Sequence, residues 1–217
     1  RGITKSTLES CGVYFTKDTE GKETVHYTYP NGVKHRELPK SIKNSGKMDA
    51  FYGQDDYSGG KILTVTEGEE DRLSVIQMMG DYPCVSVPMA GPSKEFWANA
   101  TKYLEGFEKV YLSVDNDDKG DALVDKFYRM FPGKIYRLNH GKFKDANEFL
   151  QNNEVYAYKQ AWWNAVKVKP SDIFCTAEDF LNIFDETPNY EYFKTGIEDL
   201  DDKMLGIHKG AFTLIVA

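Results

Sequence analysis

The sequence has few cysteines and no long apolar segment. Its three cysteines, Cys11, Cys84 and Cys175, lie far apart, and no C-x-x-C pair occurs. A zinc site and a disulfide framework are therefore excluded as organising features, and we expect reduced thiols. No apolar run has the length of a membrane span, and residues 1–4 do not begin a signal peptide. We expect a cytoplasmic protein without a membrane partner and, since no initiator methionine is present, a piece of a longer polypeptide.

Positive charge is scarce overall but concentrated in one segment. The chain carries 27 Lys and Arg residues against 34 Asp and Glu residues, a net charge of −7, which by itself disfavours nucleic-acid binding. Between residues 34 and 47, however, five cations accompany a single acid, Glu37: Lys34, Arg36, Lys40, Lys43 and Lys47. Carboxylates gather instead at residues 67–71 and 115–118. A basic lobe facing an acidic site is typical of metal-dependent enzymes acting on polyanions, because the metal supplies the charge that the acidic site lacks.

The distribution of apolar residues predicts an α/β fold. Residues 1–58 form short strands and turns in this interpretation, with a hairpin between 24–29 and 33–38. Further strands are expected at 61–66, 84–87, 109–114 and 134–138. Helices are expected at 69–79, 93–104, 119–130, from Asp145 onward, at 154–168 and at 177–184. Alternation of this kind is typical of a mostly parallel sheet covered by helices.

Three carboxylates follow predicted strands directly. Glu67 comes after the strand at 61–66, and Asp115 and Asp117 come after the strand at 109–114. Because ligands of an open α/β sheet bind at the carboxyl ends of its strands, we expect the two sets to converge. Residues i and i+2 of an extended segment point the same way, so Asp115 and Asp117 can present two carboxylates to Mg²⁺. The structural alternative is that these acids cap the helices that follow them.

This constellation resembles the TOPRIM family over about residues 60–150. The family motif is a Glu after a first hydrophobic strand, here residues 65–68 (VTEG), and a D-x-D after a later strand, here residues 112–117 (LSVDND). The resemblance implies a TOPRIM fold and chemistry at phosphodiesters that depends on Mg²⁺ or Mn²⁺. It also implies catalytic and metal-binding roles for Glu67, Asp115 and Asp117.

Three further segments resemble primases in particular. Residues 66–71 (TEGEED) are similar to the primase T-E-G-x-x-D, and residues 144–148 (KDANE) to the K-D-x-N/D-E that closes primase TOPRIM domains. This resemblance adds Asp71 and Asp145 to the metal-side carboxylates. Residues 40–53 resemble the basic K-x-x-N-S…Y-G segment of bacterial and phage primases, although that segment usually spaces its lysine and N-S more tightly. It implies nucleotide or DNA binding by Arg36, Lys40, Lys43 and Lys47.

The end of the chain resembles the lead-in of RecA-like hexameric helicases. Residues 195–201 (TGIEDLD) and 210–217 (GAFTLIVA) carry this resemblance, and the sequence stops before a P-loop. The whole is similar to the bifunctional primase-helicases of short-tailed bacteriophages and their mitochondrial relatives. Four regions are predicted: a basic N-terminal primase lobe at 1–58, a TOPRIM catalytic domain at 59–152, a helical extension and linker at 153–194, and the first segment of a RecA-like helicase domain at 195–217.

The resemblance implies a DNA primase core that makes short RNA primers on single-stranded DNA from ribonucleoside triphosphates. Glu67 is then the general base or a third metal carboxylate, and we expect like charges nearby to raise its pKa. We expect this chain to be monomeric and to lack helicase ATPase activity. The full-length protein, with its zinc-binding and helicase domains, is expected to form a hexameric ring. Two alternatives stay open: a TOPRIM nuclease or topoisomerase-like enzyme, and a DNA-binding element of a replicative helicase whose primase activity has decayed.

Overall fold

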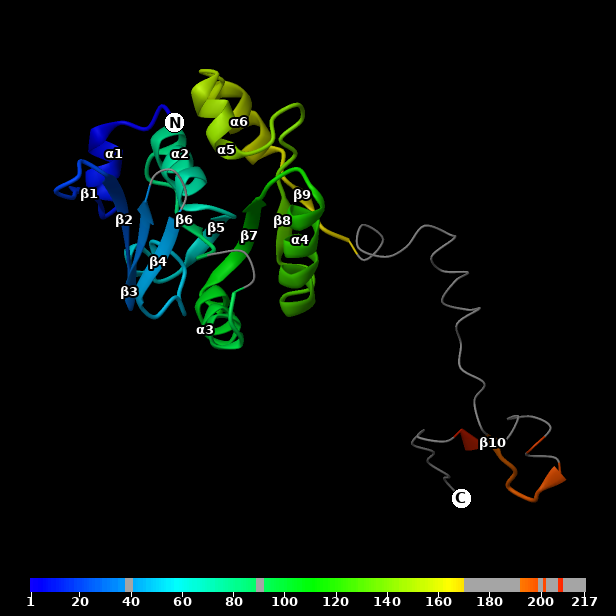
Figure 1. The fold of residues 1–217 in the computed structure, drawn as a ribbon. Coiled ribbons are helices and arrows are strands. Elements are labelled where there is room, and N and C mark those ends of the chain that lie inside the picture. Colours follow the sequence, from blue (N-terminus) through cyan, green and yellow to red (C-terminus); the bar gives the residue numbers. More distant parts are fainter. Residues whose placement is uncertain (38–40, 89–91, 170–191, 199–200, 202–206, 209–217) are drawn as a thin grey trace. The chain divides into compact units, whose positions relative to one another are not determined.

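The protein forms two compact units, residues 1–169 and residues 170–217. The computed structural model describes residues 1–37, 41–88, 92–169, 192–198, 201, 207 and 208. The first unit contains two β-sheets and the helices α1 to α6 (Figure 1). It therefore holds both the predicted basic lobe and the predicted catalytic domain. The domain boundaries drawn from the sequence stay predictions.

A four-stranded antiparallel sheet forms the N-terminal part of the first unit. Its strands, in spatial order, are β1 (Val13–Lys17), β2 (Glu23–Tyr29), β3 (Gly32–Glu37) and β4 (Ser41–Gly46). The predicted hairpin is the β2–β3 pair, in which Tyr27 lies opposite Lys34. Helix α1 (Lys5–Ser10), which we did not predict, precedes this sheet. Thr4 caps that helix, because its hydroxyl accepts a hydrogen bond from the backbone N–H of Thr7.

A five-stranded sheet forms the rest of the first unit, with the strand order β6-β5-β7-β8-β9. Its strands are β5 (Gly60–Thr66), β6 (Cys84–Ser86), β7 (Phe107–Ser113), β8 (Ile135–Arg137) and β9 (Val166–Lys167). The pairings among β6, β5, β7 and β8 are parallel, and β9 is antiparallel to β8. The helices around it are α2 (Glu69–Met79), α3 (Lys94–Glu105), α4 (Asp118–Met130), α5 (Ala146–Gln151) and α6 (Val155–Trp163). The predicted α/β fold with a mostly parallel sheet is confirmed.

Helix α2 joins the two sheets because it is apolar on two sides. Leu73 packs into a cluster with Tyr27 and other residues of the antiparallel sheet. Val75 and Met78 pack into a second cluster, which contains Tyr111 of β7 and residues of α5 and α6. Burial on both sides fixes α2 between the sheets. The first turn of α2 follows β5 directly, so this packing also sets the position of the acidic residues 67–71.

The helix predicted at 154–168 is too long, and this part of the prediction is wrong. Helix α6 ends at Trp163, and its C-cap is Asn164. Residues 166 and 167 instead pair with β8, and the backbone N–H of Val168 donates to the carbonyl of Ile135 at 2.9 Å. An exposed strand edge leaves backbone donors and acceptors unpaired, and pairing with the edge of β8 satisfies them. Strand β9 has only two residues, which is too short for the sequence to show a strand period.

The second unit contains a short antiparallel pair of strands, β10 (Tyr192–Phe193) and β11 (Ile207–His208). Asp201 accepts hydrogen bonds at 2.7 Å from both the backbone N–H and the hydroxyl of Thr195. The helix predicted at 177–184 and the segment 210–217 lie outside the described residues. Across the described ranges, no helix combines the length and apolar character that crossing a membrane requires.

Candidate active site

Glu67 lies in the turn between β5 and α2, and a hydrogen bond of its side chain connects the end of β5 to the end of β7. Its carboxylate accepts a hydrogen bond from the backbone N–H of Asp115, directly beyond β7. The Oε2 atom of Glu67 is buried and has no hydrogen-bond partner among the described residues. Burial, followed by the charges of Asp115 and Asp117, raises the pKa of Glu67 above its usual value. The expected direction of this pKa shift is confirmed, although burial contributes more than the like charges do.

Asp115 and Asp117 are held by the close approach of α4 to the end of β7. Asp117 is the N-cap of α4, and its Oδ1 accepts from the backbone N–H groups of Lys119 (3.0 Å) and Gly120 (3.1 Å). These hydrogen bonds, with that of Gly120 first, lower the pKa of Asp117. A Cβ on Gly120 would lie 2.0 Å from the carbonyl oxygen of Asp115, so only glycine allows this approach. The capping alternative thus holds for one oxygen of Asp117.

Asp71 and Asp145 form a second pair of carboxylates beside the first set. The Oδ1 of Asp71 accepts a hydrogen bond from the backbone N–H of Asn147 at 3.1 Å. Asp145 caps α5, because its Oδ1 accepts a hydrogen bond from the backbone N–H of Glu148 at 2.8 Å. Burial, and next the charge of Asp145, raises the pKa of Asp71 to about 8. The charge of Asp115 adds to this effect. The structure therefore brings all five predicted carboxylates into one electrostatically coupled cluster, the carboxylate cluster: Glu67, Asp71, Asp115, Asp117 and Asp145.

A lysine that we did not predict as a site residue neutralises part of this cluster. The Nζ atom of Lys144 lies 2.8 Å from Oδ2 of Asp115. Its charge also favours the ionised forms of Glu67 and Asp117. The signal in the sequence was its position directly before Asp145 in the KDANE segment. Nothing in that local pattern shows that it reaches Asp115, which lies 29 residues earlier in the numbering.

The carboxylate oxygens of the cluster are donors of the kind that divalent cations prefer. Within the described ranges, no group of three or more His, Cys, Asp and Glu side chains is arranged to hold one metal ion. The ammonium of Lys144 binds Asp115, and one oxygen of Asp117 is used for the helix cap. The buried, unpartnered Oε2 of Glu67 and the raised pKa of Asp71 nevertheless indicate a site that gains from a cation. Carboxylate oxygens suit Mg²⁺ and Mn²⁺, and the metal-binding roles of these residues stay predictions.

Three of the four described cations of the basic segment at 34–47 pair with acids from elsewhere in the chain, which corrects our expectation of a largely uncompensated basic run. Lys34 is buried, and its Nζ lies 2.6 Å from Oε1 of Glu69 and 2.9 Å from the carbonyl of Pro88. Nη1 of Arg36 lies 2.5 Å from Oε1 of Glu70. Both acids belong to the first turn of α2. Counting charge along the chain missed these partners, because they are brought together only when the antiparallel sheet packs against α2.

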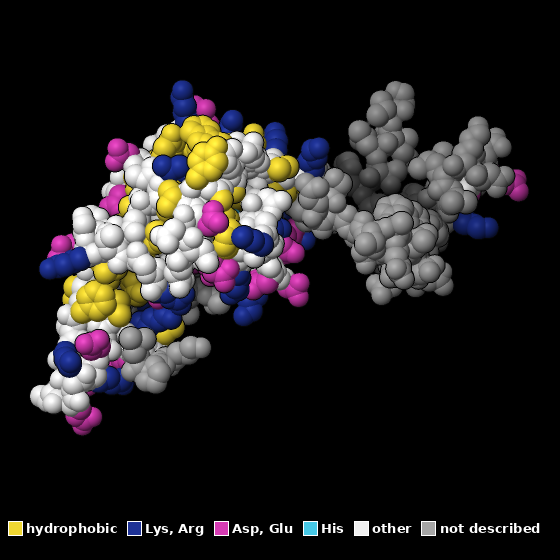
Figure 2. Space-filling view, turned by 90° about the horizontal axis from the view of Figure 1, so that it is seen from above, with side chains coloured by type: hydrophobic (Ala, Val, Ile, Leu, Met, Phe, Trp, Pro, Cys, Tyr) yellow, Lys and Arg dark blue, Asp and Glu magenta, His cyan; other side chains and the backbone are white. Residues whose placement is uncertain are grey.

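Lys43 and Lys47 form exposed ion pairs instead. Lys43 lies 2.8 Å from Glu37, and Lys47 lies 2.9 Å from Glu95, with both lysine side chains about two-thirds exposed. Exposed pairs of this kind contribute little and exchange readily with other anions. On the face shown in Figure 2, Lys and Arg side chains lie among Asp and Glu side chains. Lys40 lies outside the described residues.

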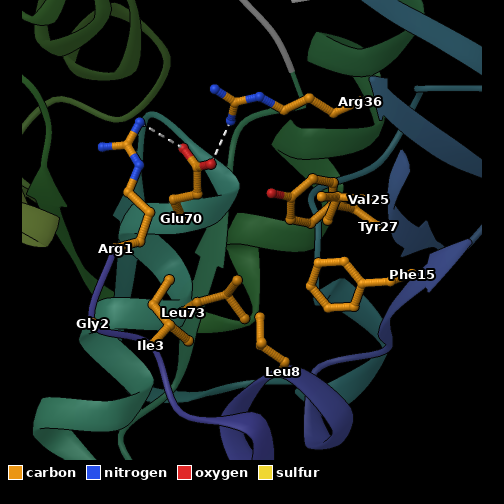
Figure 3. Close-up of a pocket in the computed structure, with 10 residues that line it drawn as sticks. All are labelled: Arg1, Gly2, Ile3, Leu8, Phe15, Val25, Tyr27, Arg36, Glu70 and Leu73. Atoms are coloured by element: carbon orange, nitrogen blue, oxygen red, sulfur yellow. Dashed lines mark hydrogen bonds and ion pairs between the residues drawn. The ribbon is translucent and has the colours of Figure 1, made fainter. Parts of the chain in front are cut away.

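A pocket of about 340 Å³ opens beside the first turn of α2 (Figure 3). Its apolar lining comprises Ile3, Leu8, Phe15, Val25 and Leu73. Arg1 and Arg36 share the carboxylate of Glu70 across the pocket, at 3.5 and 2.5 Å. Arg1 also donates to the side chain of Asn147 at 3.3 Å, and the backbone of Asn147 binds Asp71. This pocket is therefore connected to the carboxylate cluster by hydrogen bonds.

The fold and the carboxylate cluster define a Toprim-like domain joined to an antiparallel sheet. Residues 64–150, from β5 to α5, match the family model described as Toprim-like. The sequence is 31% identical to that of the primase fragment of the bacteriophage T7 primase-helicase, and the fold is similar to its crystal structure with a TM-score of 0.68. That similarity covers 74% of this chain and 71% of the T7 fragment. The chain belongs to the primase family that this T7 fragment represents.

Two further comparisons agree with this membership. The primase domains of two T7 subunits, solved with the lagging-strand DNA polymerase, an RNA/DNA hybrid and dTTP, are similar at 32% identity and a TM-score of 0.69. That similarity covers 77% of this chain and 90% of the solved chain. The DNA helicase/primase of Enterobacteria phage T3 is 29% identical over all of this chain. This chain spans only 40% of the length of the phage T3 protein.

Proposed function

We propose that this chain is a DNA primase core that joins ribonucleotides into short primers on single-stranded DNA. The observation that carries the proposal is the meeting of Glu67 and Asp115 at the ends of β5 and β7 in a Toprim-like domain. Membership of the primase family supports the reaction, and the T7 structure with an RNA/DNA hybrid and dTTP supports the choice of substrates. The nuclease or topoisomerase-like alternative and the decayed alternative are not favoured by these relatives.

The carboxylate cluster would hold Mg²⁺ or Mn²⁺, in keeping with the general dependence of this family on divalent metals. Asp115 and Asp117 are the proposed principal ligands, with Glu67, Asp71 and Asp145 beside them. When bound, such an ion screens the charge of a triphosphate and makes a nearby hydroxyl more acidic. The protein's own contribution is a set of carboxylates held in place by β5, β7 and the first turns of α2, α4 and α5.

Glu67 is the proposed general base. The 3′-hydroxyl oxygen of the growing primer forms a bond to the α-phosphorus of the incoming triphosphate, and the bond to pyrophosphate breaks. Glu67 takes the proton of that hydroxyl, and pyrophosphate leaves with the bonding electrons. The raised pKa of Glu67 suits this role, because a base works best when its pKa approaches the working pH. Arg36, Lys40, Lys43 and Lys47 are the proposed contacts to triphosphate or template phosphates.

The partners are proposed from the relatives. The T3 relative is a helicase/primase, so we propose that the complete polypeptide adds zinc-binding and helicase domains and forms a hexameric ring in the cytoplasm. We expect the 217-residue chain itself to be monomeric and to lack ATP-driven unwinding.

Primer synthesis tests this proposal directly. The purified chain is incubated with single-stranded DNA, labelled ribonucleoside triphosphates and Mg²⁺, and the products are separated by length. We expect short labelled RNA that disappears when EDTA is added. Cleavage or relaxation of DNA without any RNA product would support the nuclease or topoisomerase-like alternative instead. A folded chain that binds DNA but forms no phosphodiester bonds would support the decayed alternative.

A further inference from the structure

We propose that Lys144 is a resident counter-ion of Asp115 that yields its place to a divalent cation and then binds the phosphates of the incoming nucleotide. This inference rests on the proposed function, since it takes Asp115 as a metal ligand. It assigns a binding role to a residue that neither the strand-end pattern nor the basic segment indicated. The support comes from the loop that carries Lys144, from its side chain and from the contrast with Lys34.

The backbone of Lys144 is fixed to the end of β7. Its carbonyl accepts from the backbone N–H of Asn116 at 2.9 Å, and its own N–H donates to the side chain of Glu148 at 2.8 Å. The Nδ1 atom of His140 approaches the same carbonyl at 3.5 Å, and its Nε2 lies 3.0 Å from the hydroxyl of Ser113. These contacts hold the base of the lysine side chain at a constant position relative to the D-x-D segment.

The side chain of Lys144, by contrast, is held by one ion pair among the described residues and reaches solvent. It is 55% exposed, whereas that of its partner Asp115 is 16% exposed. A partly hydrated ammonium on a four-carbon stem costs little to displace. A divalent cation at Asp115 would carry twice the charge of the ammonium and would compete with it for the same carboxylate. Repulsion by the cation would push the ammonium of Lys144 outward, where the phosphates of a bound triphosphate would offer new partners.

Lys34 shows what a purely structural lysine looks like in this protein. Its side chain is 10% exposed, and its Nζ is held by both Glu69 and the carbonyl of Pro88. Lys144 makes a single ion pair among the described residues and retains contact with solvent. Lys142, in the same loop, is a matched control because its Nζ lies over the ring of Phe143, 5.0 Å from the centroid. Lys142 therefore carries the same charge two residues away without the contact to Asp115.

The first measurement is Mn²⁺ binding to the 217-residue chain, followed by the loss of the free Mn²⁺ signal in electron paramagnetic resonance. Lys144→Gln should bind Mn²⁺ about threefold to tenfold more tightly than the wild type, because the competing ammonium is gone. Lys142→Gln should bind it as the wild type does. Asp115→Asn should lose most of the binding. Thermal melts of each variant establish that all are folded.

The second measurement is the affinity for α,β-methylene ATP, which cannot react, in the presence of saturating Mn²⁺. Lys144→Gln should bind this probe about tenfold more weakly, since one charge-assisted contact to phosphate is lost. Lys144→Arg should restore most of that affinity, and Lys142→Gln should leave it unchanged. Lys144→Gln should therefore raise the affinity for Mn²⁺ and lower the affinity for the triphosphate probe. A purely structural ion pair would not produce opposite changes in these two affinities.

The outcomes separate the inference from the proposed function. Unchanged Mn²⁺ binding by folded Asp115→Asn would remove the metal site and the inference with it. If Asp115→Asn loses Mn²⁺ but Lys144→Gln binds Mn²⁺ no more tightly than the wild type, the inference is overturned and the proposed metal site stands. Tighter Mn²⁺ binding with unchanged affinity for the triphosphate probe would also overturn it, since Lys144 would then never reach the nucleotide.

Discussion

The first turn of α2 and the turn that leads into it carry acids with two opposite environments. On the side of the antiparallel sheet, Glu69 is paired with Lys34, and Glu70 with Arg36. On the side of the parallel sheet, Glu67 and Asp71 lie near other carboxylates, and the pKa of each is raised. Four acids within five residues are therefore divided into a paired set and an unpaired set.

The difference separates structural from functional charge. In the paired set, opposite charges that are buried or partly buried hold the antiparallel sheet against α2. In the unpaired set, burial and like charges disfavour ionisation, so the folded protein carries a free-energy cost that a cation would relieve. A cluster of this kind is more typical of a binding site than of a scaffold.

The largest expected effect lies in the carboxylate cluster to which the unpaired set belongs. Asp115→Asn keeps the shape of the side chain but removes its charge, so primer synthesis should fall by about a thousandfold or more. Circular dichroism and thermal melts should stay close to those of the wild type. Asp118→Asn, a change of an exposed acid in the first turn of α4, is the control and should retain activity. Full primer synthesis by folded Asp115→Asn would show that the cluster containing the unpaired set is not the functional site.

In the paired set the largest expected effect is on stability. Lys34→Ala leaves Glu69 buried without its cation, so the free energy of unfolding should fall by about 3 to 5 kcal/mol. Lys43→Ala breaks an exposed pair and should cost about 1 kcal/mol or less. Urea denaturation of both variants measures the difference. Equal losses would show that burial of the Lys34–Glu69 pair has no energetic weight.

A smaller effect with a defined pH dependence is expected for Asp71. Its pKa is about 8 in the folded protein and near 3.8 in an unfolded chain, so between these values the folded state holds a proton that the unfolded state lacks. The stability of the metal-free protein should therefore fall as pH rises from about 4 to about 8 and then level off.

Asp71→Asn should remove this component and be more stable than the wild type above pH 8, by about 1 to 2 kcal/mol. Thermal melts in EDTA across pH 4 to 9 provide the measurement. Parallel curves for variant and wild type would show that Asp71 ionises normally.

The smallest expected effect concerns the exposed lysines of the antiparallel sheet. Neutralising Lys43 and Lys47 together should weaken binding of single-stranded DNA or triphosphate, because their pairs with Glu37 and Glu95 exchange readily. Each lost phosphate contact should lower the slope of log affinity against log salt by about 0.7 to 0.9. Mn²⁺ binding should change little. Titrations at several salt concentrations provide the measurement. If the wild type and the double variant have the same affinities and slopes, both lysines are solvated surface residues.

Much of the fold was predictable because its signals are local. The strands β5 and β7 and the helix α2 follow from the period of their apolar residues, and Asp145 begins α5 as a capping residue should. The strand-end rule likewise predicted that Glu67 and Asp115 would meet. The end of α6 and the edge strand β9 were not predictable, because β9 has only two residues and depends on pairing with β8 rather than on a local pattern.

The sequence by itself determined which residues follow the ends of β5 and β7, and thus placed Glu67, Asp115 and Asp117 at one edge of the parallel sheet. Only the tertiary structure decided which acids are neutralised. Lys34 and Glu69 are 35 residues apart, and Lys144 and Asp115 are 29 apart, yet each pair is in contact. The period of a strand or helix is set by neighbouring residues, whereas an ion pair depends on distance in space. Burial sets its strength, and both distance and burial exist only once the sheets and α2 have packed together.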